Sequence, residues 1–324
     1  MIAIEALRDR YVAERPVYEQ LANHVRDLLE SRLRRLGLAY SMDARAKDVS
    51  SFIKKVMRKV NTHESPYDDI HDKAGVRIVV TYAESVHEVR RAIEELFPGS
   101  VCEDKQLNLP YDRLGYLGVH FEVTLTDGLL DAGREDFHGK ICEIQLHTRA
   151  QNVWAGISHE LLYKPSQAPP PDVRRAIYRL MALVEIFDNE TRGARDVILG
   201  QGGFQEARML DQLERQYYRL AGRPYDHELS LEVLAHLIPS LSTDEISGFG
   251  ALMDDFVASN SVKLGEIFER YAHDDRCSPL LFQPESLLVF ERFQNAPFIL
   301  EDIWQQAMPS EWLESLTSIW GVKL

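Results

Sequence analysis

The chain has 324 residues, of which 45% are hydrophobic and 27% are charged, and its formal net charge is −14. This length accommodates a substantial core and predicts about two domains. The acidic charge disfavours broad nucleic-acid binding, which normally uses a basic surface to displace counterions. The first residues, rich in Arg and Glu, match neither a signal peptide nor a membrane span. Together with three widely separated cysteines, which fit a reduced compartment, this predicts a cytoplasmic protein without membrane partners.

The first predicted elements are helical. Apolar residues recur at helical spacing over residues 4–36, and Gly37 is a plausible stop. A further helix is expected over 48–60, with Ser50 or Ser51 near its start.

Strand signals follow. Residues 76–82 form a short, β-branched apolar run typical of a buried strand, and 84–97 form an amphipathic helix. Residues 119–126 and 140–147 alternate as strands do, with a Gly- and Asp-rich loop over 127–139. This order indicates an α/β (α+β) domain with a mixed sheet flanked by helices.

The second half of the chain is predicted to be helical. Helices are expected over 149–163 and 171–197, and from about residue 203 the strand signals disappear. We expect two domains, residues 1–222 and an all-helical module over 225–324. The helices expected after residue 203 are 203–221, 228–238, 243–258, 262–272 and 284–293.

Four clusters could carry chemistry, and the first is basic. If residues 45–55 were helical, Lys47, Ser51 and Lys55 would share one face at i, i+4 and i+8, with Arg45 just before them. Cations and a hydroxyl on one face suit a polyphosphate, which needs charge neutralisation and hydrogen-bond donors. A solvated basic helix face is the alternative.

The second cluster is Asp72 followed by Arg77, at the mouth of the strand over 76–82. A carboxylate in such a place is a common metal ligand, and Mg²⁺ is usually held by one or two carboxylates plus substrate phosphates. A guanidinium can stack on a base or grip phosphate. A loop acid and a surface arginine are the alternative.

The third cluster places Tyr116 between Gly115 and Gly118, with His120 next. Flanking glycines expose a ring that could stack on a nucleobase, although a turn with a core tyrosine explains the pattern equally well.

The fourth cluster is a strand. Period-two alternation puts Glu143, Gln145 and His147 on one face, and Asn152 follows. Three polar residues on one strand face suggest a lined cleft, and a solvent-facing strand is the alternative.

In combination and order, these clusters resemble the synthetase domain of the RelA/SpoT alarmone family, over roughly residues 40–165. The patterns that carry the resemblance are Arg-x-Lys-x-x-x-Ser (45–51), Asp-x-x-Gly-x-Arg (72–77), Gly-Tyr-x-x-x-His (115–120), Glu-Ile-Gln-x-x-Thr (143–148) and Trp-Ala-x-x-x-His-x-x-x-Tyr-Lys (154–164).

The resemblance implies a nucleotidyltransferase-like mixed sheet and a Mg²⁺-dependent pyrophosphokinase, in which a ribose 3′-hydroxyl attacks the β-phosphorus of ATP and AMP leaves. Asp72 and Glu143 would bind Mg²⁺, and Glu143 could also help to remove the hydroxyl proton. The other roles that the resemblance implies are ATP binding by Arg45, Lys47, Ser51, Lys55 and Arg77, and acceptor binding by Tyr116, His120, Gln145 and Asn152.

Two departures from the family pattern concern the acceptor. Leu117 and Gly118 stand where the family usually has Arg-Ser, and His147 stands where it usually has Arg. Both changes remove a fixed cation, because His147 carries charge only below about its ordinary pKa of 6.5 unless its surroundings raise that pKa.

Three functions therefore stay open. The first is an alarmone synthetase that makes (p)ppGpp from ATP and GDP or GTP. The second is a toxin-like relative that modifies the tRNA 3′ end or adenine nucleotides. The third is a non-catalytic nucleotide sensor. The module over 225–324 could form homo-oligomers or bind a regulatory partner, and the default for Trp304, Trp312 and Trp320 is that they pack its core.

Overall fold

The computed structural model describes residues 4–60, 65–104, 118–130, 134–158, 161, 170–201, 204–272, 274 and 278–322. It divides into two compact units, a sheet unit (1–33 and 40–193) and a helical unit (34–39 and 194–324). None of the helices in the described ranges is both long and apolar enough to span a membrane.

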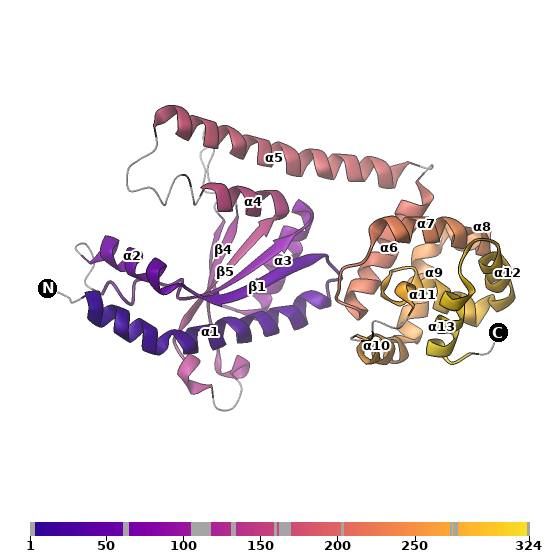
Figure 1. Cartoon of the computed structure of the whole chain (residues 1–324), viewed down its shortest axis with the longest axis horizontal. Helices are drawn as coiled ribbons and strands as arrows, with labels where there is room; N and C mark the ends of the chain where they lie inside the picture. Colours follow the sequence, from indigo (N-terminus) through magenta and orange to yellow (C-terminus); the bar gives the residue numbers. More distant parts are fainter. Residues whose placement is uncertain are drawn as a thin grey trace. The chain divides into compact units, whose positions relative to one another are not determined.

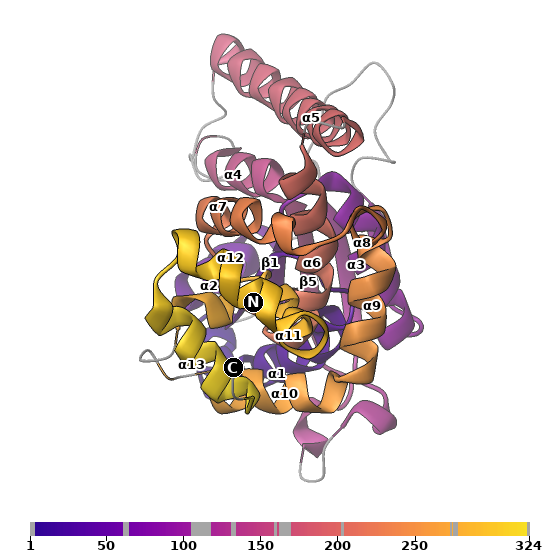
Figure 2. The same cartoon turned by 90° about the vertical axis from the view of Figure 1, so that its right-hand side faces the viewer.

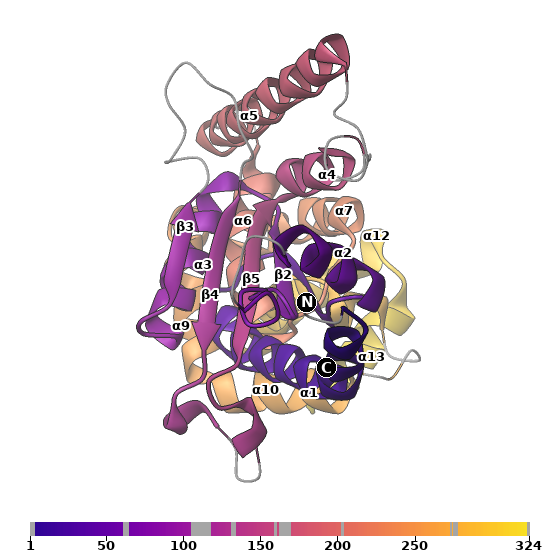
Figure 3. The ribbon, with the colours of Figure 1, turned by 90° about the vertical axis from the view of Figure 1, so that its left-hand side faces the viewer.

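The sheet unit is built on five strands in the order β1-β2-β5-β4-β3. β2 and β5 are parallel, and the other neighbours are antiparallel, so the sheet is mixed. Figure 3 shows β3, β4, β5 and β2 side by side. The strands are β1 (Tyr40–Ala46), β2 (Ala74–Val80), β3 (Val101–Asp104), β4 (Val119–Thr124) and β5 (Ile141–Thr148).

Alternation along the central strands separates an apolar face from a polar one. Val76 and Ile78 of β2, Ile144 of β5 and Phe121 of β4 are buried on the apolar face, because neighbouring strands hold them in register. Figure 1 shows α1, α3 and α4 gathered around the sheet. The helices of this unit are α1 (Ile4–Arg34), α2 (Val49–Lys59), α3 (Ala83–Leu96), α4 (Arg149–Ser158) and most of α5 (Pro171–Gly200).

The predicted mixed sheet flanked by helices is confirmed, but two of its strands were not predicted. β1 and β3 lie at the two edges of the sheet, where each pairs with one neighbour. The helix predicted over 48–60 is confirmed as α2, with Ser50 and Ser51 near its start, and Asp48 caps it by accepting a hydrogen bond from Ser51 N.

The predicted all-helical C-terminal region is also confirmed. At its centre, α11 buries eight side chains and packs against α9, α12 and α13. Figure 2 shows this group of helices. Trp304 and Trp320 are buried in this core and Trp312 packs against it, as expected. The helices are α6 (Gln205–Leu220), α7 (His227–Leu237), α8 (Thr243–Ser247), α9 (Phe249–Ser259), α10 (Ser261–Arg270), α11 (Ser286–Asn295), α12 (Pro297–Ala307) and α13 (Ser310–Trp320).

The helical unit includes the short segment Arg34–Ala39 that joins α1 to β1. Gly37 in this segment has a φ of 66°, and a Cβ added to it would lie 2.2 Å from the Arg215 carbonyl oxygen of α6. Arg219 Nε of the same helix donates a 3.1 Å hydrogen bond to the Arg35 carbonyl. Only glycine fits this close approach, so α6 holds the turn that leads into β1.

The helix α6 belongs to the core of the helical unit. Met209, Leu213 and Tyr217 of α6 are buried in one cluster with α7, α9 and α11. The compact units divide within α5, between residues 193 and 194. The expected division at 222–225 stays a prediction.

Candidate functional site

A row of polar side chains crosses the polar face of the sheet. The register pairs Asp43 of β1 with Arg77 of β2, Arg77 with Gln145 of β5, Gln145 with His120 of β4, and His120 with Glu103 of β3. Paired residues of neighbouring strands point to the same side. The polar residues of five strands are therefore collected on one surface.

A second row lies beside the first. Arg45 of β1 pairs with Gly75 of β2, which pairs with Glu143 of β5, and Glu143 pairs with Glu122 of β4. Because Gly75 has no side chain, nothing on β2 stands between Arg45 and Glu143. Their backbones are two strand spacings apart, about 10 Å.

Asp72, just before β2, lies in contact with two lysines. Its Oδ2 accepts hydrogen bonds from Lys47 Nζ at 2.5 Å and from Lys55 Nζ at 2.6 Å. Burial alone would raise the pKa of the Asp72 carboxyl, but the two ammonium groups hold that pKa below its usual value. Asp72 is thus a carboxylate with two cations on one of its oxygens.

Glu143, in the middle of β5, is hydrogen-bonded at both oxygens. Gln145 Nε2 donates to Oε2 at 2.8 Å, and His120 Nδ1 lies 3.2 Å from Oε1. Burial raises the pKa of Glu143 and so does the Asp72 charge, but the bonds to His120 and Gln145 lower it below its usual value. Glu143 is therefore a second ionised carboxylate, close enough to Asp72 to interact with it.

Arg77 is oriented by two amides. Its Nε and Nη2 lie 3.3 and 3.1 Å from Gln145 Oε1, and its Nη1 lies 3.4 Å from Asn152 Oδ1 of α4. These three contacts hold the guanidinium in the first polar row, and none of them is to a carboxylate.

His147 is fully buried at the end of this strand face. Burial, together with the neighbouring His120 and Arg77, lowers its pKa to about 3. Its surroundings therefore do not raise the pKa. His147 is neutral near pH 7 and cannot replace a fixed cation.

The predicted helical spacing of the basic cluster was wrong. Arg45 lies in β1 and Lys47 follows that strand, so only Ser51 and Lys55 lie on α2. Lys47 nevertheless meets Lys55, because both reach Asp72. Ser51 is exposed in the first turn of α2. Tyr116 lies outside the described residues.

The residues present fit a divalent cation. Asp72 Oδ1 is buried and has no hydrogen-bond partner within the described part of the chain, so it could accept a metal bond. The described ranges hold no cluster of three or more His, Cys, Asp or Glu side chains placed to bind a metal. Two carboxylates completed by substrate phosphates are the arrangement usual for Mg²⁺.

Two polar residues of this surface were not predicted from the sequence. Asp43 belongs to the unpredicted strand β1, and Glu122 lies beside His71, whose Nδ1 is 2.9 Å from Glu122 Oε2. The signal for Glu122 was available, because it follows His120 at period two on a predicted strand.

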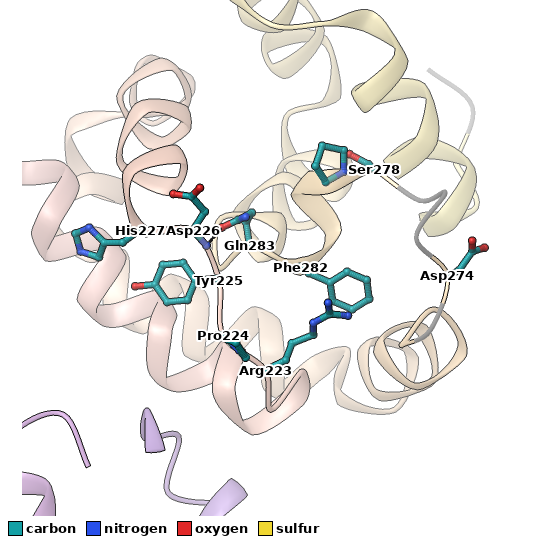
Figure 4. A pocket seen from close by; sticks show the side chains of 10 residues that line it. Arg223, Pro224, Tyr225, Asp226, His227, Asp274, Ser278, Phe282 and Gln283 are labelled. Atoms are coloured by element: carbon teal, nitrogen blue, oxygen red, sulfur yellow. Dashed lines mark hydrogen bonds between the residues drawn. The ribbon is translucent and has the colours of Figure 1, made fainter. Parts of the chain in front are cut away.

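The helical unit contains a separate pocket of about 700 Å³. Figure 4 shows the Arg223 guanidinium beside the Phe282 ring, 4.0 Å from its centre. Tyr225, Asp226 and Gln283 line the pocket too, and its ten lining residues include none of the predicted site residues.

Comparison with known proteins identifies the sheet unit. Residues 44–168 match the family model for the "Region found in RelA / SpoT proteins". This part of the chain is thus similar to the RelA/SpoT synthetase region. The predicted range of 40–165 is thereby confirmed, and residues 194–324 of the helical unit lie outside the match.

Two curated relatives from Bacillus subtilis (strain 168) are similar over nearly half of the chain. GTP pyrophosphokinase YjbM is 28% identical over 147 residues, which is 45% of this chain and 67% of that protein. GTP pyrophosphokinase YwaC is 24% identical over 155 residues, which is 47% of this chain and 71% of that protein.

Solved structures show weaker similarity. The crystal structure of small alarmone synthetase 1 from Bacillus subtilis aligns with a TM-score of 0.46 at 22% identity, covering 60% of this chain and 100% of that one. Its complex with its product pppGpp aligns with a TM-score of 0.44 at 24% identity, covering 55% and 93%.

Proposed function

We propose that the chain is a Mg²⁺-dependent pyrophosphokinase that transfers the β,γ-diphosphate of ATP to the ribose 3′-hydroxyl of GDP or GTP, making (p)ppGpp. The observation that carries this proposal is the pairing of two ionised carboxylates, Asp72 and Glu143, next to the cations Lys47 and Lys55. Similarity to the RelA/SpoT region and distant similarity to two GTP pyrophosphokinases support it.

The donor nucleotide is assigned to the β1–α2 side of the polar face. Lys47 and Lys55 are placed to bind triphosphate oxygens through charge-assisted hydrogen bonds, with Ser51 at the N-terminal end of the same helix. Arg45 and Arg77 are flat cations suited to stacking on adenine. Asp72 and Glu143 would hold Mg²⁺, which would neutralise phosphate charge.

In the proposed reaction, the acceptor 3′-oxygen forms a bond to the β-phosphorus, and the bond from that phosphorus to the α,β-bridging oxygen breaks. AMP leaves with that electron pair. The hydroxyl proton passes to Glu143 or to water. His120 and Gln145 orient Glu143, and most of the remaining catalysis is positioning and charge neutralisation.

The residues expected to bind the acceptor depart from the RelA/SpoT pattern, and one of these departures favours a second candidate function. His147 is neutral, so the strand face supplies no cation there for acceptor phosphates. This favours a toxin-like relative that acts on adenine nucleotides or the tRNA 3′ end. The net charge of −14 argues against tRNA.

The test is transfer of label from γ-³²P-ATP with Mg²⁺ to GDP, GTP, a second adenine nucleotide or deacylated tRNA, each offered separately. Because the β- and γ-phosphates move together, label should follow the acceptor, and we expect it on GDP or GTP. Label on adenine nucleotide or tRNA would identify the second candidate. Binding of ATP without transfer to any acceptor would contradict both and indicate a nucleotide sensor.

A further inference from the structure

The two lysines next to Asp72 bind the same oxygen. Lys47 Nζ and Lys55 Nζ both contact Oδ2, while Oδ1 has no hydrogen-bond partner among the described residues. The Asp72 and Lys47 side chains are each 16% exposed, whereas that of Lys55 is 44% exposed. One partly buried carboxylate therefore faces two ammonium groups, and the combined charge of the three groups is +1.

A free divalent cation would approach Asp72 against this positive charge. Like charges separated by a few ångström repel strongly where water is partly excluded, and screening by salt is weak there. A nucleotide triphosphate changes the balance, because its oxygens offer both ammonium groups charge-assisted hydrogen bonds. Lysine also has a long, flexible stem that allows its ammonium group to move from one acceptor to the other.

We propose that Lys47 and Lys55 keep Asp72 closed to free divalent cations until a nucleotide triphosphate draws the lysines away. This proposal rests on the proposed function. The cation-binding site is then created by the nucleotide, so the metal binds together with ATP and the nucleotide-free chain has low affinity for metal alone.

The proposal is tested with Mn²⁺, an EPR-visible substitute for Mg²⁺, titrated into the full chain without nucleotide. The first variant is Lys55→Met, because this side chain is the more exposed, and the second is the double Lys47→Met/Lys55→Met variant. The matched control is Lys54→Met, which removes the same charge from an exposed position of α2. Thermal unfolding checks that each variant is folded.

We expect Lys55→Met to bind Mn²⁺ at least about tenfold more tightly than the wild type, the double variant more tightly still, and Lys54→Met like the wild type. Adding Asp72→Asn to the double variant should abolish the gain. Adding α,β-methylene ATP, whose diphosphate cannot be transferred, should give the wild type a tight Mn²⁺ site.

Three results would overturn this proposal without touching the proposed function. The first is a wild type that binds Mn²⁺ without nucleotide as tightly as the lysine variants do, and the second is a gain that survives Asp72→Asn. If the lysines only stabilise the fold, Lys55→Met lowers the melting temperature without changing Mn²⁺ affinity, which also contradicts the proposal. Failure of the proposed function looks different: either no label is transferred from γ-³²P-ATP to any acceptor, or the wild type does not bind α,β-methylene ATP with or without Mn²⁺.

Discussion

The two units of the chain place their polar residues differently. In the sheet unit, alternation along five strands gathers carboxylates, amides and arginines on one face, where Glu143, Gln145 and Arg77 are linked by hydrogen bonds. In the helical unit, most side chains of the central helix α11 are buried, and its Arg292 is paired with Glu291 and with Glu245 of α8. A shared surface of interacting groups suggests chemistry, whereas charges paired within a core suggest structural roles.

Each unit also contains a buried titratable side chain whose pKa is strongly displaced, and the two pKa values move in opposite directions. Burial lowers the pKa of His147 in the sheet unit to about 3 and raises that of Glu285 in the helical unit to about 7. In both cases burial disfavours the charged form. The sheet unit should therefore be destabilised by acid and the helical unit by base.

The largest expected effect concerns the turn at Gly37, which belongs to the helical unit and leads into the sheet. Gly37→Ala should destabilise the protein by about 3 kcal/mol, because an added Cβ would overlap the Arg215 carbonyl and L-residues are strained at this positive φ. Urea unfolding followed by tryptophan fluorescence measures the effect, since Trp304, Trp312 and Trp320 lie in the helical unit.

The matched control is Gly99→Ala. Gly99 also has a positive φ, of 89°, but no atom lies within 4 Å of the point that an added Cβ would occupy. This variant should lose only the strain contribution, about 1 kcal/mol. Equal losses for the two variants would mean that the close approach of Gly37 to α6 has no energetic role, contrary to our inference.

The second effect is the pH dependence of the helical unit. Burial raises the folded-state pKa of Glu285 from its ordinary value of 4.5 to about 7. Between pH 4.5 and about 7, the folded state therefore binds more protons than the unfolded state. Its contribution to stability is complete below pH 4.5 and is lost as the pH rises through about 7, a loss of about 2–3 kcal/mol between pH 5 and 8. Glu285→Gln should remove most of this slope. Unfolding by urea at several pH values, followed by tryptophan fluorescence, tests this, and an unchanged slope in the variant would refute it.

The third effect is the opposite dependence in the sheet unit. The folded-state pKa of His147 is lowered, so the unfolded state binds more protons between about pH 3 and the ordinary 6.5. Stability should fall by about 2 kcal/mol from pH 7 to pH 5. Hydrogen exchange of peptides from β5 measures this locally. His147→Gln should flatten the dependence, and equal acid sensitivity in wild type and variant would contradict the assignment.

Much of the fold could be predicted from the sequence where the signal was local. The central strands β2, β4 and β5 are apolar or alternate clearly, and the long helices have regular apolar spacing. The edge strands β1 and β3 could not be recognised in this way. β1 contains Asp43 and Arg45, and its strand conformation depends on pairing with β2.

The same distinction holds for the candidate site. Side chains two residues apart on a strand point to the same face, so the sequence predicts that Glu143 and Gln145 lie together. The hydrogen bond between them agrees with this prediction. The meeting of Lys47, Lys55 and Asp72 could not be predicted, because it joins a strand end, a helix and a loop through tertiary packing. Nor could the sequence reveal that α6 holds the turn at Gly37.

We propose that Asp72 and Glu143 form one catalytic centre on the polar face. The most direct measurement is the rate of label transfer from γ-³²P-ATP to the preferred acceptor, for the wild type, Asp72→Asn and Glu143→Gln. We expect each variant to lose at least about 10³-fold in rate, and the double variant to lose little more, because the residues act as a unit. Transfer at the wild-type rate by either single variant would contradict the claim.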